Sequence, residues 1–132
     1  MPGSKRFLSP ETLPPPSGYN HVVDSPAGRI IYISGQVPLD PAGRLVGEGD
    51  IEVQARQVFG NLSAALEAAG ASWQDVVKLS FFVVDVSQMA SVRAVRDEYV
   101  NTQDPPASTL IEVSSLFRDD VLIEVEAVAV RE

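Results

Sequence analysis

The stretch "VVKLSFFVVDV" (residues 76–86) constrains the fold more than any other part of the chain. β-Branched and aromatic residues dominate it, which is typical of a strand. Side chains of a strand alternate between the two faces of its sheet, and this strand is apolar on both. One face is expected to carry Val77, Leu79, Phe81 and Val83, and the other Val76, Phe82 and Val84. Such a strand has to be covered on both faces.

Two amphipathic helices are predicted to cover one face of the sheet that contains this strand. Apolar residues recur at helical spacing through residues 50–70, where Asp50 suits the N-cap and Gly70 the C′ position. Gly60 lies inside this helix and is expected to mark a close packing contact. A second helix is predicted over residues 87–101, capped by Asp85 or Ser87 and ended by "DPP".

The remaining apolar runs are expected to be strands. Residues 5–9 predict a short one, and residues 19–25 and 29–35 predict a hairpin around "PAG". Two closing strands are predicted at 107–113 and 121–130. This order predicts an α+β fold with two helices on one face of a mixed sheet. Because no third helix is present to cover the other face, self-association through that face is the economical solution.

Composition excludes several classes of function. A chain of 132 residues fits one domain, here residues 1–132. A net charge of −8 and the absence of a basic run argue against nucleic-acid binding. With no cysteine, disulfides and thiolate catalysis are excluded, and the single histidine, His21, cannot build a histidine-rich metal site. The alternative left open is a carboxylate-only site for a hard cation, but no EF-hand spacing supports one, and we expect no metal.

The sequence also bears on location. "MPGSKRFLSP" lacks the apolar core of a secretory signal, and no apolar run approaches the ~20 residues of a membrane span. We expect a cytoplasmic protein that makes no membrane contact.

Polar residues inside two strands are the candidates for chemistry. In "YISGQVP", Ser34 and Gln36 share a strand face and Gly35 permits a close backbone approach. In the last strand, Glu124 and Glu126 lie opposite the apolar face. They are either a solvated or salt-bridged strand face, or they include a carboxylate that positions water in a cleft.

Together these segments resemble the Rid family, also called YjgF, RidA or endoribonuclease L-PSP. The resemblance covers nearly the whole chain and rests on "SGYNHVV", "IYISGQVPLDP", "QARQVFGNLSAALEAAGAS", "DVVKLSFFVVDV", "PASTLIEVSSL" and "DVLIEVEAVAVR". It implies a chorismate-mutase-like fold and a homotrimer with three clefts between subunits. It also implies hydrolysis of reactive enamines and imines to 2-keto acids and ammonia, without a cofactor.

The resemblance assigns several site residues. The family's cleft tyrosine corresponds to Tyr19, and its Ser-Gly-Gln stretch to Ser34, Gly35 and Gln36. The glutamate that helps to hold the attacking water corresponds to Glu124.

Three positions depart from the family pattern. The helix asparagine corresponds to Arg93, the substrate-gripping arginine to Ser108, and a cysteine two residues later to Leu110. A guanidinium binds a carboxylate through two charge-assisted hydrogen bonds, whereas serine offers one neutral donor. Arg93 or Arg118 is a candidate to replace the missing cation.

These residues support a Rid-type hydrolase of imines, enamines or another small polar metabolite, with altered substrate choice. Two alternatives remain open: a trimer that binds a small metabolite without turnover, and an interaction or chaperone-like trimer whose clefts do not matter. Ribonuclease activity fits least, given the net charge of −8 and the lack of a histidine pair.

Overall fold

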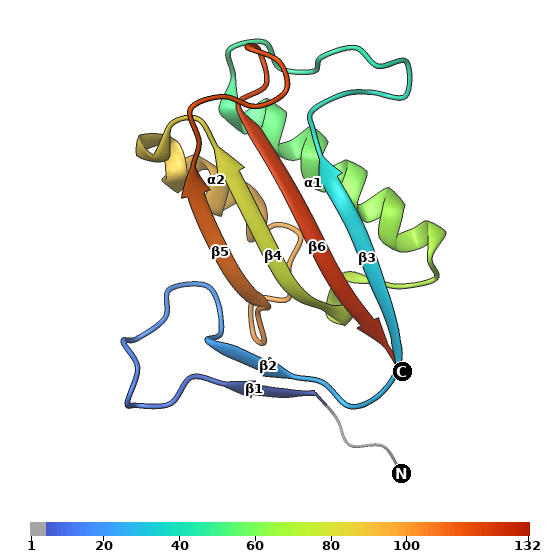
Figure 1. Ribbon diagram of the computed structural model, residues 1–132, viewed down its shortest axis with the longest axis vertical. Helices are drawn as coiled ribbons and strands as arrows, with labels where there is room; N and C mark the ends of the chain where they lie inside the picture. The colour runs from blue at the N-terminus through green and yellow to red at the C-terminus, as the bar shows by residue number, and fades with distance from the viewer. Residues whose placement is uncertain (1–4) are drawn as a thin grey trace.

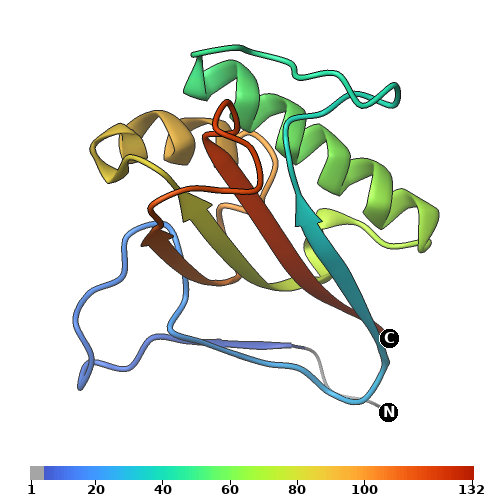
Figure 2. The same cartoon turned by 45° about the horizontal axis from the view of Figure 1, so that its top comes forward.

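The computed structural model describes residues 5–132, so residues 1–4 of the expected domain lie outside the described residues (Figure 1). A four-stranded sheet, two α-helices and a small two-stranded sheet make up the fold (Figure 2). In chain order the elements are β1 (Arg6–Leu8), β2 (Val22–Asp24), β3 (Arg29–Gln36), α1 (Ile51–Ala68), β4 (Val76–Val83), α2 (Met89–Arg96), β5 (Ala107–Glu112) and β6 (Ile123–Arg131).

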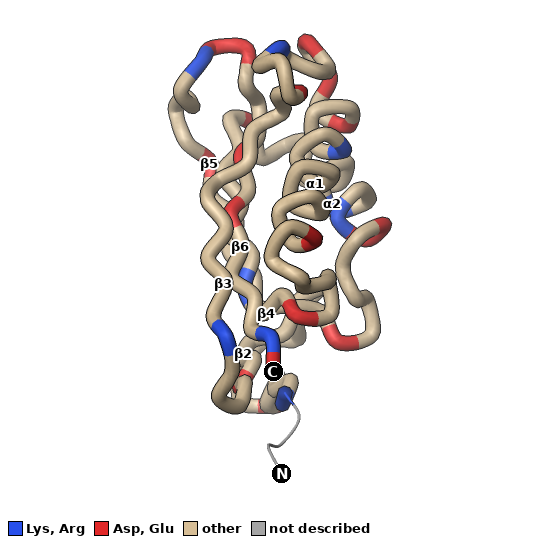
Figure 3. The backbone as a smooth tube through the Cα atoms, turned by 90° about the vertical axis from the view of Figure 1, so that its right-hand side faces the viewer, with Lys and Arg blue, Asp and Glu red and all other residues tan. Residues whose placement is uncertain are grey.

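The main sheet has the strand order β3-β6-β4-β5. β6 runs antiparallel to both β3 and β4, while β4 and β5 are parallel and connected through α2. Figure 3 shows both helices on the same side of this sheet, and within residues 5–132 no helix lies on the other side. The predicted α+β fold, a mixed sheet with two helices on one face, is confirmed. We call the helix-free side the open face.

Neither described helix combines the length and the apolar character needed to cross a bilayer.

The predicted hairpin is wrong. β2 pairs with β1 in the small sheet, and β3 pairs with β6 instead. Gly28, just before β3, lies close to the end of β6, where a Cβ at this position would lie 2.7 Å from the Arg131 carbonyl oxygen. The chain thus passes tightly over the end of β6 and enters the main sheet there, so the "PAG" segment joins two sheets.

A bulge alters the predicted faces of β4. Its register with β6 shifts between Val76 and Lys78, so Val76 is buried on the helix side while Val77 is only partly buried. The sequence pattern predicts the reverse, with Val77 rather than Val76 on the same face as Leu79, Phe81 and Val83. Beyond the bulge the alternation holds, with Leu79, Phe81 and Val83 buried under the helices.

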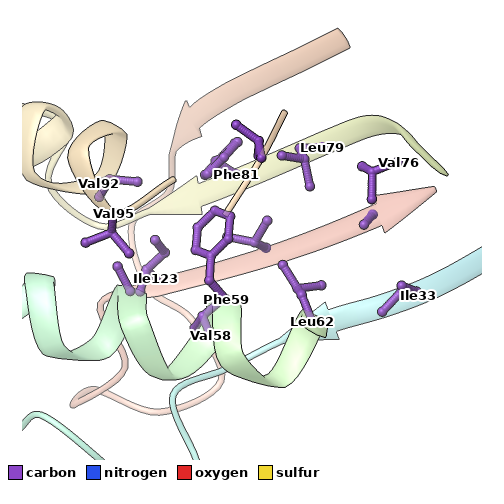
Figure 4. Close-up of a cluster of buried hydrophobic side chains, with 14 of the residues drawn as sticks. Ile33, Val58, Phe59, Leu62, Val76, Leu79, Phe81, Val92, Val95 and Ile123 are labelled. Atoms are coloured by element: carbon purple, nitrogen blue, oxygen red, sulfur yellow. The ribbon is translucent and has the colours of Figure 1, made fainter. Parts of the chain in front are cut away.

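The core lies between the helices and the sheet (Figure 4). Phe59 of α1 is fully buried and stacks against Trp73 and Tyr99, with ring centroids 5.6 and 5.3 Å apart. The Trp73 indole N–H donates to Ser63 Oγ over 2.9 Å, which satisfies its polar edge. Phe59 also contacts Phe81 of β4, with ring centroids 6.0 Å apart, so the same side chain packs α1 against the sheet and against the segments before β4 and after α2.

The ends of α1 confirm the predicted caps. Asp50 accepts hydrogen bonds from the backbone N–H groups of Glu52 and Val53, and Gly70 has φ 71° just beyond the C-cap. The close contact predicted at Gly60 is wrong, since a Cβ there would meet no atom within 4 Å. α2 is shorter than predicted at both ends: Asp85 caps a 3₁₀ turn (Val86–Gln88) that precedes it, and the helix ends at Arg96, with turn and bend residues in place of the predicted helix over 97–100.

Gln54 is a buried polar residue that sequence patterning did not identify. Its side-chain amide donates to the carbonyl oxygens of Gly47 (3.0 Å) and Asp120 (2.9 Å), and accepts from Leu122 N–H (2.8 Å). It therefore ties α1 to the loop before it and to the segment that enters β6.

We expect Gln54→Met to lower the free energy of unfolding by about 2–5 kcal/mol, because three partly buried backbone groups lose their partners at similar side-chain volume. Urea denaturation followed by circular dichroism measures this loss. Gln74→Met, at an exposed position, is the control and should change stability by less than about 0.5 kcal/mol. Equal stability of the two variants would contradict the assigned role of Gln54.

Candidate functional site

A cavity of about 310 Å³ opens between α2, β5 and the N-terminal segment. This volume suits a small metabolite. Its lining residues are Ser17, Tyr19, Phe81, Val86, Met89, Val92, Arg93, Arg96, Ser108 and Leu110.

One wall of the cavity is residues 9–21, which we call the strap. Asn20 ties it to the loop before β5, donating from its backbone N–H to Pro106 O (3.3 Å) and from its side chain to Pro105 O (2.9 Å). Inside the strap, a His21 ring nitrogen lies 2.7 Å from Pro14 O and the ring makes an edge contact with Tyr19. These contacts hold Tyr19 at the cavity.

The register of β5 directs its side chains into the same cavity. Ser108 lies beside Leu79 and Leu110 beside Phe81 in the parallel β4–β5 pair. Paired residues of neighbouring strands point to the same face, and both β4 residues are buried under the helices. The structure thus brings together Tyr19, Ser108 and Leu110 with Arg93, four residues assigned from the sequence, and we call them the strap half-site.

The other four assigned residues lie elsewhere. Glu124 pairs with Phe82 and alternates with the buried Ile123 and Val125, so its side chain is on the open face. Ser34, Gly35 and Gln36 are at the end of β3. Together with Glu124 they form what we call the glutamate half-site.

Gly35 makes room for the carboxylate of Glu124. A Cβ at Gly35 would lie 1.9 Å from Glu124 Oε2 and 2.7 Å from Cδ. The β3–β6 register shifts between Ile33 and Gln36, so the ladder bulges at this point and the backbone approaches the carboxylate. Glu124 is therefore positioned against the main chain and remains partly exposed.

Arg96 is the site residue that the sequence interpretation missed. The signal was present, because residues three apart share a helix face and Arg96 follows Arg93 at that spacing. Both arginines line the cavity.

Arg118, the other candidate cation, is engaged locally. Its guanidinium donates to both carboxylate oxygens of Asp120, over 3.0 and 2.7 Å. This pairing lowers the pKa of the Asp120 carboxyl below its usual value. Arg118 does not line the described cavity.

No group of three or more His, Cys, Asp or Glu side chains within residues 5–132 is arranged to hold a metal ion.

Comparisons with known proteins agree with the fold. The profile of the family described as Endoribonuclease L-PSP matches residues 10–131. A RutC family protein of Pyrococcus horikoshii is 40% identical over 129 residues, covering 97% of this chain and 99% of its own. A 2-iminobutanoate/2-iminopropanoate deaminase of Salmonella typhimurium is 41% identical over 106 residues, covering 79% of this chain and 81% of its own.

Solved structures give the same result. The structure of the conserved Rid family protein YyfB from Yersinia pestis, a protein of unknown function, superposes with a TM-score of 0.86 at 36% identity. The match covers 98% of this chain and all of that one. The chain therefore belongs to the Rid family, the endoribonuclease L-PSP family of the matching profile.

We expect Gly35→Ala to displace the Glu124 carboxylate without unfolding the protein. The overlap falls on the end of a flexible side chain, which can swing away. Thermal unfolding should change little, while a crystal structure of the variant should show Glu124 in another rotamer. Gly60→Ala is the matched control, and should stabilise α1 by about 0.5–1 kcal/mol. An unmoved Glu124 would refute this description of the site.

Proposed function

We propose that this chain is a Rid-type hydrolase that converts small imines, and the enamines that equilibrate with them, to carbonyl compounds and ammonia. Three observations support the proposal: membership of the family, similarity to a protein named as an iminobutanoate deaminase, and the Glu124 carboxylate held beside the backbone of Gly35. The last carries the most weight, because a positioned carboxylate is what water activation needs.

The proposed reaction is a simple hydrolysis. Glu124 accepts a proton from water as the oxygen of that water adds to the imine carbon, and the imine nitrogen takes up a proton from solvent. Glu124 then returns its proton to the nitrogen of the intermediate. The C–N bond breaks and ammonia leaves as the C=O bond forms, and the hydroxyl proton of the intermediate is released to solvent. One water enters and one ammonia departs, so no cofactor or redox partner takes part.

A complete cleft is proposed to form between copies of the chain. Within one chain the strap half-site faces the helices and the glutamate half-site is on the open face. The open face also exposes large apolar side chains: Ile30 is 57% exposed, Tyr32 77% and Ile111 45%. Packing of open faces in a homotrimer, as the family resemblance implies, would bury these residues and bring half-sites of neighbouring copies together.

Ser108 sets the proposed change in substrate choice. The strand position at which the family pattern has arginine carries a neutral hydroxyl here. A serine cannot form the paired, charge-assisted contact that an arginine makes with a carboxylate. Ligand selection therefore has to depend on the other cavity residues.

We expect Glu124→Gln to reduce turnover by about 10²–10⁴-fold, the usual contribution of a positioned acid–base group. The substrate, 2-iminobutanoate, is generated in situ from threonine by a dehydratase, and release of keto acid and ammonia is followed. Glu126→Gln, two residues along the same strand face, is the matched control and should keep parental activity. Both variants are compared as oligomers of the same mass.

Binding without turnover is the alternative that the Ser108 substitution favours. In that case the wild-type protein would not accelerate imine hydrolysis even at high concentration, yet it would bind the corresponding keto acid. This result would reject the hydrolase and retain the cleft.

We expect Tyr32→Glu to dissociate the oligomer, because it places charge on the open face that is proposed to pack between copies. Sedimentation equilibrium should give three times the 14.2 kDa chain mass for the wild-type protein and one chain mass for the variant. Val53→Glu is the control, since Val53 lies in the first turn of α1, where an acidic residue is favourable. A wild-type monomer would contradict the proposed assembly.

A further inference from the structure

Arg96 is a buried arginine at a cavity, which is unusual for this residue type. Only 7% of its surface is exposed, although arginines normally keep their heads in water. It is the last residue of α2, where the helix dipole favours a cation. That position explains why a positive charge is tolerated there, but it does not explain burial beneath the strap.

The guanidinium is seated against Gly18 of the strap. A Cβ at Gly18 would lie 2.2 Å from Nη2 and 3.0 Å from Cζ of Arg96, and Gly18 has φ 77°, a conformation that favours glycine. The guanidinium of Arg96 therefore occupies space that a side chain at position 18 would fill. Because Asn20 ties the strap to Pro105 and Pro106, the seat does not depend on Gly18 alone.

Most of the hydrogen-bonding capacity of Arg96 remains unused. Its Nε–H donates to Asp97 Oδ1 over 2.9 Å, and within residues 5–132 this is its side chain's only hydrogen bond. A guanidinium has five N–H donors, so the four on Nη1 and Nη2 are left for a ligand. No nitrogen of Arg96 is both fully buried and unpaired, so these donors face accessible space.

The charge around the cavity is opposite to that of the whole chain. Two arginines and three hydroxyl-bearing residues line it, and none of its described lining residues is acidic. The chain as a whole has a net charge of −8. Asp97, which holds one edge of Arg96, is itself not a lining residue and is about half exposed. The cavity is therefore locally positive in an acidic protein.

We propose that Arg96 binds the carboxylate of the ligand, in place of the arginine missing at position 108, and that the ligands are small monocarboxylates such as 2-imino and 2-oxo acids. Nη1 and Nη2 supply paired donors to the two carboxylate oxygens. Ser108, being small, leaves space in the cavity for the ligand. The reaction rests on the proposed function above, but the binding role of Arg96 does not.

The test is direct binding of 2-oxobutanoate, measured by isothermal titration calorimetry, with 2-butanone as the neutral probe of similar size. The wild-type protein should bind 2-oxobutanoate and discriminate against 2-butanone. Arg96→Met should weaken 2-oxobutanoate binding by about ten- to a hundredfold, because it removes hydrogen bonds to a charged group. Arg96→Lys retains the charge without the paired donors. Its affinity for 2-oxobutanoate should lie between those of the wild-type protein and Arg96→Met.

A matched control separates the two arginines. Arg93→Met, one turn away and half-buried, should weaken binding less than Arg96→Met does. A second route covers the case in which Arg96→Met fails to fold: Gly18→Ala keeps the charge but displaces the guanidinium, and should also weaken binding. Ser108→Arg in the Arg96→Met background should restore binding.

The inference is overturned if the wild-type protein does not bind 2-oxobutanoate, if folded Arg96→Met binds it as tightly as wild type, or if Arg93 carries the effect instead. These outcomes are independent of catalysis. Binding that depends on Arg96, without acceleration of imine hydrolysis, rejects the hydrolase and retains this inference. If Arg96→Met instead hydrolyses the imine with an unchanged KM, the hydrolase is retained and this inference is rejected.

Discussion

Because the helices cover only one face of the main sheet, the face that a strand residue occupies decides which surroundings its side chain meets. Both helices pack on the same face, and strict alternation along β5 and β6 then sends Ser108 beneath α2 and Glu124 to the other side. Neither residue can change sides without moving its whole strand out of register. Within one chain the strap half-site and the glutamate half-site consequently lie on opposite faces of the main sheet, and the open face carries exposed apolar side chains.

The packing of α2 and the strap on the helix-covered face also decides from which wall a guanidinium reaches the cavity. An arginine on β5 would reach the cavity from the sheet, whereas Arg96 reaches it from the end of α2 under the strap. An arginine at position 108 and Arg96 would enter the cavity from different walls. A carboxylate bound by one would therefore have a different orientation from a carboxylate bound by the other. A small residue at position 108 is compatible with the second route, because it leaves the cavity open where the longer side chain would have passed.

Local patterns in the sequence predicted the elements well, and long-range contacts account for what they missed. The β-branched run of β4 and the caps of α1 depend on neighbours in the chain, and both were found. The partner of β3 and the bulge beside Val77 depend on β6, which is about 50 residues or more away. Gln54 and Arg96 look like ordinary polar helix residues until the segments that bury them are placed. Alternation also placed Glu124 correctly opposite the apolar face, but it gave no sign that Gly35 lies against it.

The strap has a practical consequence for work on this protein. Residues 9–21 belong to neither helix nor to the main sheet, yet they carry Tyr19 and close over Arg96. A protease cut or a bulky fusion in this segment would open the pocket while the sheet and its helices stayed folded. Circular dichroism and melting curves would then report an intact fold although the pocket had been opened, so preparations should be checked for an uncut strap as well as for fold.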